Sequence, residues 1–185
     1  MYLPQDGDDA ELVRRVLAGD TAAFEVLVRR HQRVIFTVAL RMLGDREEAQ
    51  DATQNALVKA YQKLGTYDAN FRFFSWIYRI VVNECLNVRR ARPPREPAGL
   101  EPVAAGEALE VLEAQDRRRR VQGAILALPA DYRQVIVLRH FTELSYEEIS
   151  ATLGIPVKTV KSRLYTARQR LAELLAGAAP SRGNR

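Results

Sequence analysis

The spacing of apolar residues constrains this chain more than any other feature of its sequence. Apolar side chains recur every three or four positions over most of the 185 residues, which is the period of an amphipathic helix. Glycines interrupt the pattern at Gly19, Gly44 and Gly65, where helices are expected to end. No segment alternates apolar and polar residues between hairpin turns, as a half-buried strand would. The sequence therefore predicts an all-α fold.

Short polar residues mark where several of these helices should begin. Asp, Ser and Thr side chains accept hydrogen bonds from the first free amides of a helix, and a Glu three residues later can complete a capping box. The first three helices are expected to begin at Asp9 (for residues 10–18), at Asp20, and at Asp45 with Glu48. A fourth helix is expected from Phe71 to about Arg90, before a pair of prolines, and a later helix is expected to begin at Pro129.

The composition changes between residues 92 and 106, which hold four prolines and two glycines but few large apolar side chains. Such a stretch cannot build a core of its own and is typical of a linker. It predicts two small helical domains, at 9–92 and 108–176, joined by a flexible linker over 93–107. Residues 177–185 are expected to form a disordered tail.

The charge pattern follows the same division. The chain carries 28 Lys and Arg against 23 Asp and Glu, a net charge of +5, which weakly favours an anionic partner. Residues 71–95 hold six arginines and one acid, residues 96–116 hold six acids and no Lys or Arg, and residues 157–170 hold five basic groups and no acid. Two basic surfaces on a tether suit a protein that binds nucleic acid at two points. Two solvated helix faces would give the same pattern.

Residues 145–170 carry the strongest motif. Ser145 and Glu148 predict a capping box, Gly154 a left-handed helix end, and Pro156 the start of a second helix. This order predicts a helix-turn-helix, whose second helix would meet base edges and phosphates in the DNA major groove. A helical hairpin with a basic outer face is the alternative. The second helix carries the candidate DNA-binding residues Lys158, Lys161, Ser162, Arg163, Tyr165 and Arg168.

Six of the fourteen aromatic residues fall between Tyr67 and Tyr78. Exposed rings can stack on unpaired bases while nearby guanidinium groups bind phosphates; Arg89 and Arg90 follow at the end of the same predicted helix. The alternative is that the rings only pack in the core, which is expected for at least half of them and for Trp76. The loop over 65–70 is the better place for base capture.

Together these blocks resemble the group IV, or extracytoplasmic-function, sigma factors of the bacterial sigma-70 family. The resemblance extends from about residue 9 to 175. It is carried by DATQNALVKAYQKL (51–64) and FRFFSWIYRIVVN (71–83), which resemble region two, and by LPADYRQVIVLRHFTELSYEEIS (128–150) and VKTVKSRLYTARQRL (157–171), which resemble region four. The lack of a longer middle domain between the blocks is typical of this minimal class.

The resemblance implies a function for each domain. The first would bind the clamp helices of the β′ subunit of core RNA polymerase and hold the promoter −10 element as unpaired DNA, while the second would read the −35 element as duplex. It also implies an anti-sigma factor, because a partner that contacts two tethered domains gains avidity. By position, the family contacts polymerase at Asp51, Gln54 and Asn55, −10 bases at Tyr67 and Asn83, and the −35 element at Lys161, Ser162 and Tyr165.

Two other classes of function are weighed against this one. A one-component regulator with a sensor domain would explain residues 128–175 but not the DATQNAL segment. An enzyme is disfavoured because His31, His140 and Cys85 show no metal-ligand spacing, phosphate loop or nucleophile motif; no catalytic residue, metal or cofactor is expected. His31 is expected at the surface and Cys85 in the core. A single cysteine, with no signal peptide and no long apolar run, predicts a cytoplasmic protein without membrane insertion.

Overall fold

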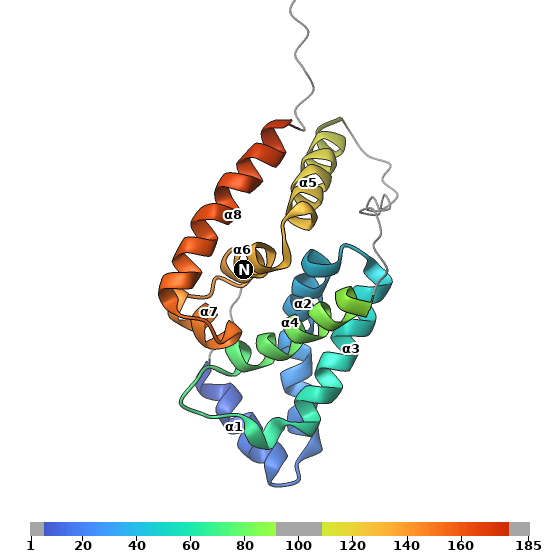
Figure 1. The fold of residues 1–185 in the computed structure, drawn as a ribbon. Coiled ribbons are helices and arrows are strands. Elements are labelled where there is room, and N and C mark those ends of the chain that lie inside the picture. The colour runs from blue at the N-terminus through green and yellow to red at the C-terminus, as the bar shows by residue number, and fades with distance from the viewer. Residues whose placement is uncertain (1–5, 92–108, 178–185) are drawn as a thin grey trace, which may run out of the picture.

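The computed structural model describes residues 6–91 and 109–177, all in helices and their connections (Figure 1). The expectation of an all-α fold is confirmed for these residues, and none of their helices is long and apolar enough to cross a membrane. The predicted linker and residues 178–185 of the predicted tail lie outside the described residues. The helices are α1 (Asp6–Leu17), α2 (Thr21–Leu43), α3 (Arg46–Gln62), the short 3-10 helix η1 (Leu64–Thr66), α4 (Phe73–Ala91), α5 (Leu109–Ala127), α6 (Ala130–Phe141), α7 (Tyr146–Leu153) and α8 (Val157–Gly177).

In the first region, α1 to α4 pack around one apolar core. Asp20 caps α2 by accepting hydrogen bonds from the amides of Ala22 and Ala23, and Asp45 caps α3 by accepting one from the amide of Glu48. Four alanines of α3 are buried, which lets α3 lie close to α2 and α4. Burial of each large apolar side chain contributes about 1.5–3 kcal/mol. Fully buried core residues include Leu27, Ile35, Met42, Leu64, Phe73 and Ile77.

Two expectations for the first region are wrong. Asp9 does not cap a helix that starts after it; it lies within α1 and is fully buried. His31 is not at the surface but is 2% exposed, and its Nε2 lies 2.8 Å from Oδ2 of Asp9. Arg30 Nη1 donates to the other carboxylate oxygen of Asp9 at 3.0 Å. The sequence pattern missed this network because buried charged groups need partners, and these partners lie more than twenty positions away.

In the second region, α5 to α8 form the predicted helix-turn-helix with its supporting helices. The capping box is present, with Ser145 Oγ accepting from the Glu148 amide and the Glu148 carboxylate accepting from the Ser145 amide. Gly154 ends α7 at φ +66°, the left-handed conformation expected of it. Ser150 Oγ donates to the Ile155 carbonyl at 2.5 Å, which ties the turn. Pro129 is the N-cap of α6, one residue before the helix begins.

The two regions contact each other directly. In Figure 1, α6 lies beside the end of α2 and α7 lies beside α4, and the contacts between these elements agree. At the end of α2, the guanidinium of the buried Arg133 donates to the Met42 carbonyl at 2.8 Å, and Gln122 donates to the Leu40 carbonyl at 3.3 Å. The Met42 carbonyl lies in the last turn of α2, where carbonyls have no partner within their own helix, so Arg133 of the second region satisfies it. The Leu40 carbonyl also accepts from the Gly44 amide at 2.9 Å. The composition of the linker did not predict this contact, because the contact is made by the helices and not by the linker.

Gly44 lies where the end of α2 meets Leu126 of the second region. Its φ of +80° is a left-handed conformation that ends α2, and a side chain here would also collide with Leu126 of α5. The left-handed turn is what favours glycine at this position, because the Leu126 methyl groups belong to a flexible side chain that can shift.

Candidate nucleic-acid and polymerase surfaces

The N-terminal half of α8 presents polar side chains to solvent above an apolar inner face. Val160, Leu164 and Ala167 are buried against α6 and α7. Tyr165 is 66% exposed, a large aromatic surface left without cover. Because the buried positions recur at helical spacing, the polar positions between them share the outer face. The predicted −35 residues exposed on this face are Lys158, Lys161, Ser162, Tyr165 and Arg168.

Arg163 differs from the other candidates on α8. Its Nη2 lies 2.7 Å from Oδ2 of Asp131 on α6, and its side chain is only 25% exposed. This ion pair joins α8 to α6, so Arg163 is better suited to hold the helix than to reach a base. Lys161 is also constrained, because its Nζ lies 5.7 Å from the centre of the Tyr146 ring, within cation–π range.

The end of α6 adds positive charge beside α8. Burial, together with the charges of Arg168 and Arg139, lowers the pKa of His140 below its ordinary value. Burial is the first cause of this shift, so the positive charge beside α8 comes from the guanidinium groups of Arg139 and Arg168, which favour DNA phosphates.

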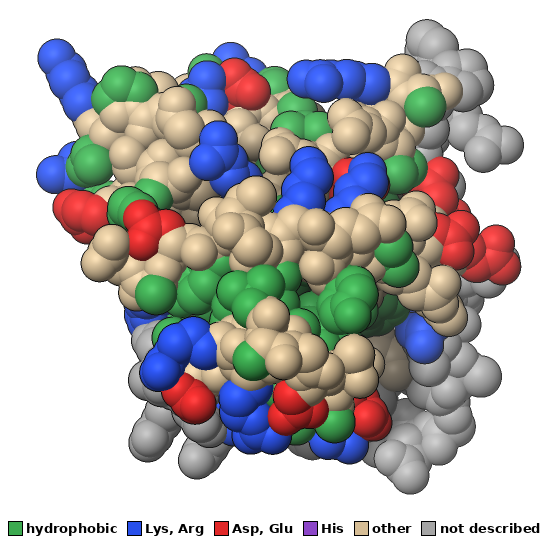
Figure 2. Space-filling view, turned by 90° about the horizontal axis from the view of Figure 1, so that it is seen from below, with side chains coloured by type: hydrophobic (Ala, Val, Ile, Leu, Met, Phe, Trp, Pro, Cys, Tyr) green, Lys and Arg blue, Asp and Glu red, His purple; other side chains and the backbone are tan. Residues whose placement is uncertain are grey.

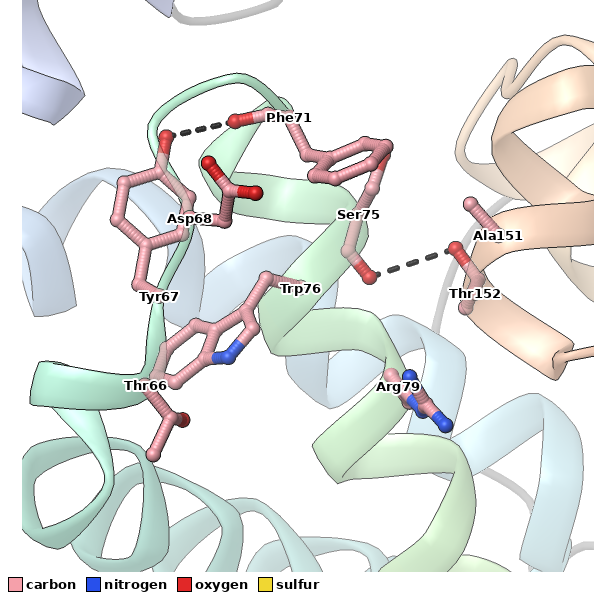
Figure 3. Close-up of a pocket in the computed structure, with 9 residues that line it drawn as sticks. All are labelled: Thr66, Tyr67, Asp68, Phe71, Ser75, Trp76, Arg79, Ala151 and Thr152. Carbon is pink, nitrogen blue, oxygen red and sulfur yellow. Dashed lines mark hydrogen bonds between the residues drawn. The ribbon is translucent and has the colours of Figure 1, made fainter.

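A cavity of about 360 Å³ lies where the loop after η1 meets α4 and α7 (Figure 3). The Tyr67 hydroxyl donates to the Phe71 carbonyl at 2.7 Å, which folds the loop over the start of α4. Phe71 is 57% exposed, and the Tyr67 and Trp76 rings meet edge to face at 5.8 Å. The residues that line the cavity are Thr66, Tyr67, Asp68, Phe71, Ser75, Trp76, Arg79, Ala151 and Thr152.

The cavity contains Tyr67 but not Asn83, the other residue expected at the −10 bases. Asn83 is exposed on α4, seven residues beyond Trp76 and thus about 10 Å along the same helix face. Arg79 lies between them on this face, and Arg90 follows seven residues after Asn83. The face therefore forms a track that leads from the aromatic cavity to basic groups.

Sequence reasoning missed three residues of this site. Trp76 was expected in the core because it falls at helical spacing with Ile77, but it is only partly buried and lines the cavity. Phe71 was counted among the six clustered aromatic residues without a role of its own, and Arg79 was not singled out. Their positions in the sequence could have indicated them. Phe71 directly follows the loop expected to capture bases, and Arg79 lies three residues after Trp76. Arg89, expected at phosphates, is partly buried, and burial lowers its pKa.

On α3, the three residues expected to bind polymerase are exposed on the side opposite the buried alanines: Asp51, Gln54 and Asn55. A shallow apolar groove adjoins them, formed with α2 and including Gln54 itself. Val58 and Tyr61 of this groove are 56% and 47% exposed. The Tyr61 ring packs edge to face against the Phe24 ring, with the ring centres 4.9 Å apart, and its outer side is open.

Hydrophobic surface also appears at one end of the molecule. Seen from below the view of Figure 1, a band of hydrophobic side chains crosses the face, with Lys, Arg, Asp and Glu side chains on either side (Figure 2). Apolar groups are thus not confined to the core.

Comparison with known proteins assigns both regions to one family. Residues 27–93 match the family described as Sigma-70 region 2, and residues 118–171 match Sigma-70, region 4. The RNA polymerase sigma-H factor of Pseudomonas aeruginosa is 37% identical over 180 residues, which cover 90% of this chain and 93% of that protein. The ECF RNA polymerase sigma factor SigW of Bacillus subtilis is 36% identical over 176 residues, covering 88% and 94%.

Solved structures agree with this assignment. CnrH, in complex with the cytosolic domain of CnrY, aligns with a TM-score of 0.74 and 26% identity over 93% of this chain and 99% of that one. RpoE of Bartonella quintana, in complex with the anti-sigma factor NepR, shares the fold with a TM-score of 0.69 and 24% identity over 84% of this chain and 98% of that one. With both regions present in the family's order, and with relatives that match nearly from end to end, the chain belongs to the extracytoplasmic-function group of the sigma-70 family of RNA polymerase sigma factors.

Proposed function

We propose that this sigma factor, which directs promoter-specific transcription initiation together with core RNA polymerase, divides that task among three surfaces. The exposed face of α3 binds polymerase, the cavity and track of α4 hold the unpaired −10 strand, and the outer face of α8 reads the −35 duplex. The helix-turn-helix supports this most strongly, because the apolar residues of α8 are buried while its first three turns leave Lys161, Ser162 and Tyr165 exposed.

The polymerase surface combines a charge with apolar contact. Asp51 supplies a carboxylate suited to a basic partner surface, and the adjoining groove with Val58 and Tyr61 supplies exposed apolar area. Aromatic and aliphatic side chains in such grooves often dominate the affinity of an interface. We assign this face to the clamp helices of the β′ subunit.

The −10 surface combines stacking with polar recognition. A base that leaves the duplex stack needs an apolar wall and polar groups for its edge. Tyr67, Phe71 and Trp76 offer the wall, and Asp68 and Arg79 offer polar groups beside it. Asn83, Arg89 and Arg90 then serve the following nucleotides and phosphates, rather than the same base as Tyr67.

The −35 surface divides its work between reading bases and holding the helix. Lys161, Ser162 and Tyr165 are placed to meet base edges, while Lys158 and Arg168 are placed for phosphates. Arg163 positions α8 through Asp131. Replacing Asp131 with alanine should therefore weaken binding to all −35 sequences, and replacing Lys161 should change the preference among them.

Sigma factors are non-catalytic, and we propose that this chain too performs no chemistry and acts in the cytoplasm, where it meets polymerase and promoter DNA. We also propose that it is held inactive by an anti-sigma factor. CnrH is seen bound to the cytosolic domain of CnrY, and a partner that contacts both regions of this chain would gain avidity from their covalent connection.

The experiment is a binding profile over all variants of a −35 duplex. Wild type, Lys161→Ala and the charge-matched control Arg14→Ala are compared; Arg14 lies on α1 in an exposed pair with Glu11. Lys161→Ala should alter preference at defined positions by about 1–3 kcal/mol, and the control should parallel wild type. If the Lys161→Ala profile is also parallel to wild type, the proposed role of α8 in base reading is wrong.

A further inference from the structure

We propose that Tyr146 is a positioning residue for −35 recognition: its ring holds the ammonium group of Lys161 where that group meets a base edge, and the ring thereby sets the preference of the chain among −35 sequences. The proposal rests on the function proposed above for Lys161. It assigns part of the specificity to a residue of α7, outside the helix that reads the DNA.

Tyr146 lies where three helices of the second region meet. It is the first residue of α7, which packs against both α6 and α8, and its side chain is partly buried. The capping box of Ser145 and Glu148 satisfies two amides at this helix start. The ring therefore extends from a backbone that is fixed on both sides of its own position.

Arg139 of α6 holds the ring in place. Its guanidinium carbon lies 5.2 Å from the centre of the Tyr146 ring, and its Nη1 donates to the Leu144 carbonyl at 2.6 Å. One arginine thus binds both the ring and the loop that leads into α7. The negative face of an aromatic ring attracts a cation within about 6 Å of its centre, so this contact restrains the ring from turning away.

Lys161 of α8 is the second cation at this ring. Its Nζ lies 5.7 Å from the ring centre, although the residue as a whole is exposed. A lysine side chain is long and flexible, and it loses much conformational freedom when it must hold one position. Contact with a ring that Arg139 already restrains limits the positions of the ammonium group before DNA arrives, which lowers the entropic cost of a base contact.

A ring holds this cation without using up its hydrogen bonds. The lysine ammonium has three N–H donors, and these remain available for base acceptors such as guanine O6 and N7. Arg163 shows the contrast, because its Nη2 lies 2.7 Å from Oδ2 of Asp131, a carboxylate that accepts its hydrogen bond and offsets its charge. Tyr146 therefore positions Lys161 without placing a negative group beside the DNA phosphates.

Loss of the ring should change specificity and leave general affinity intact. Without the ring, the Lys161 ammonium is free to pair with a phosphate of any sequence instead of a base. Phosphate contacts support the binding of every sequence, whereas base contacts discriminate among sequences. A cation–π contact at an exposed site corresponds to about a two- to fivefold factor in an equilibrium constant, and the specificity should fall by that factor.

The test uses the full chain and two labelled duplexes. One carries the −35 sequence that wild type selects from a randomised duplex pool, and the other carries the same bases in scrambled order. In Tyr146→Leu the ratio of the two affinities should fall about two- to fivefold, with the affinity for the scrambled duplex unchanged. Tyr146→Phe keeps a ring face and should keep the wild-type ratio. If Tyr146→Leu also keeps that ratio, or loses affinity for both duplexes equally, the positioning role is wrong.

Tyr132→Leu is the matched control. Tyr132 of α6 makes the same kind of contact with α8, because the guanidinium carbon of Arg170 lies 4.8 Å from the centre of its ring. Arg170 lies beyond the −35 residues of α8. This control therefore removes a ring and a cation–π contact from the same region, and it should keep the wild-type ratio.

A ring-fluorinated phenylalanine at position 146 keeps the test decisive if Tyr146→Leu does not fold. Fluorine weakens the negative face of the ring that attracts cations, while the side chain keeps its shape. Thermal unfolding should match that of Tyr146→Phe, and the ratio should fall as expected for Tyr146→Leu. A wild-type ratio in the fluorinated variant would overturn the proposal, because packing alone would then account for the ring.

Lys161→Ala separates this proposal from the proposed function. In that background Tyr146→Leu should leave the ratio unchanged, since the ring acts through Lys161; an equal fall with and without Lys161 would refute this. If Lys161→Ala changes the preference but Tyr146→Leu does not, Lys161 reads a base and the positioning role alone is wrong. If neither variant changes the preference, the base-reading role of Lys161 fails and the role of Tyr146 fails with it.

Discussion

Replacing Asp9 with alanine tests whether the buried network of α1 and α2 holds the first region together. The Asp9 carboxylate is fully buried and receives hydrogen bonds from His31 and Arg30 at 2.8 and 3.0 Å. Removing one member of a buried charged pair costs about 3–5 kcal/mol, because the remaining polar group is left buried without its partner. Arg30 is 29% exposed, so water can partly replace the hydrogen bond that its guanidinium loses.

We therefore expect the free energy of unfolding to fall by about 3 kcal/mol in Asp9→Ala. For a domain of this size that corresponds to a fall in Tm of about 6–12 °C. Urea denaturation followed by circular dichroism measures the loss. The control is Glu11→Ala, which removes an exposed carboxylate of the same helix and should change stability by less than about 0.5 kcal/mol. A loss in Asp9→Ala no larger than in Glu11→Ala would refute the reasoning.

Three further predictions follow from the other sites. Asp51→Arg should abolish binding to core polymerase in a fluorescence titration, with helix content unchanged, because it reverses the charge of the α3 face. Wild-type affinity of this variant would show that the α3 face does not bind polymerase. Asn83→Ala should lower open-complex formation more on duplex promoters than on pre-melted bubbles, and equal activity on duplex templates would count against it. Burial alone would raise the pKa of Glu148, but hydrogen bonds from Ser145 and Arg72 outweigh it and lower that pKa. Its stabilising contribution is therefore complete above its ordinary pKa of 4.5 and is lost as the pH falls through the lower folded value. Urea denaturation across that range should show a smaller pH dependence in Glu148→Gln.

Features that depend on neighbouring residues could be predicted from the sequence. The capping box of Ser145, the helix end at Gly44 and the left-handed end at Gly154 all follow from local backbone geometry. The structure confirms each of them.

Features that depend on distant residues could not be predicted from the sequence. The partner of His31 is Asp9, and helical period carries no information about which charged groups become buried together. Trp76 falls on a face that period assigns to the core, but the loop after η1 leaves a cavity over it. The contact of α7 with α4 also joins residues more than seventy positions apart, across a linker whose composition says nothing about helix packing.

Transcription from a library of promoters with randomised −35 and −10 elements, using core polymerase and this chain, tests the central claim most directly. The account predicts that transcripts arise only when the chain is present, and only from promoters that share both elements. Lys161→Ala should change the selected −35 sequences alone, and Tyr67→Ala the −10 sequences alone. The account would be contradicted if transcription were unchanged when the chain is omitted. It would also be contradicted if the transcribed promoters shared a single element that both variants alter equally.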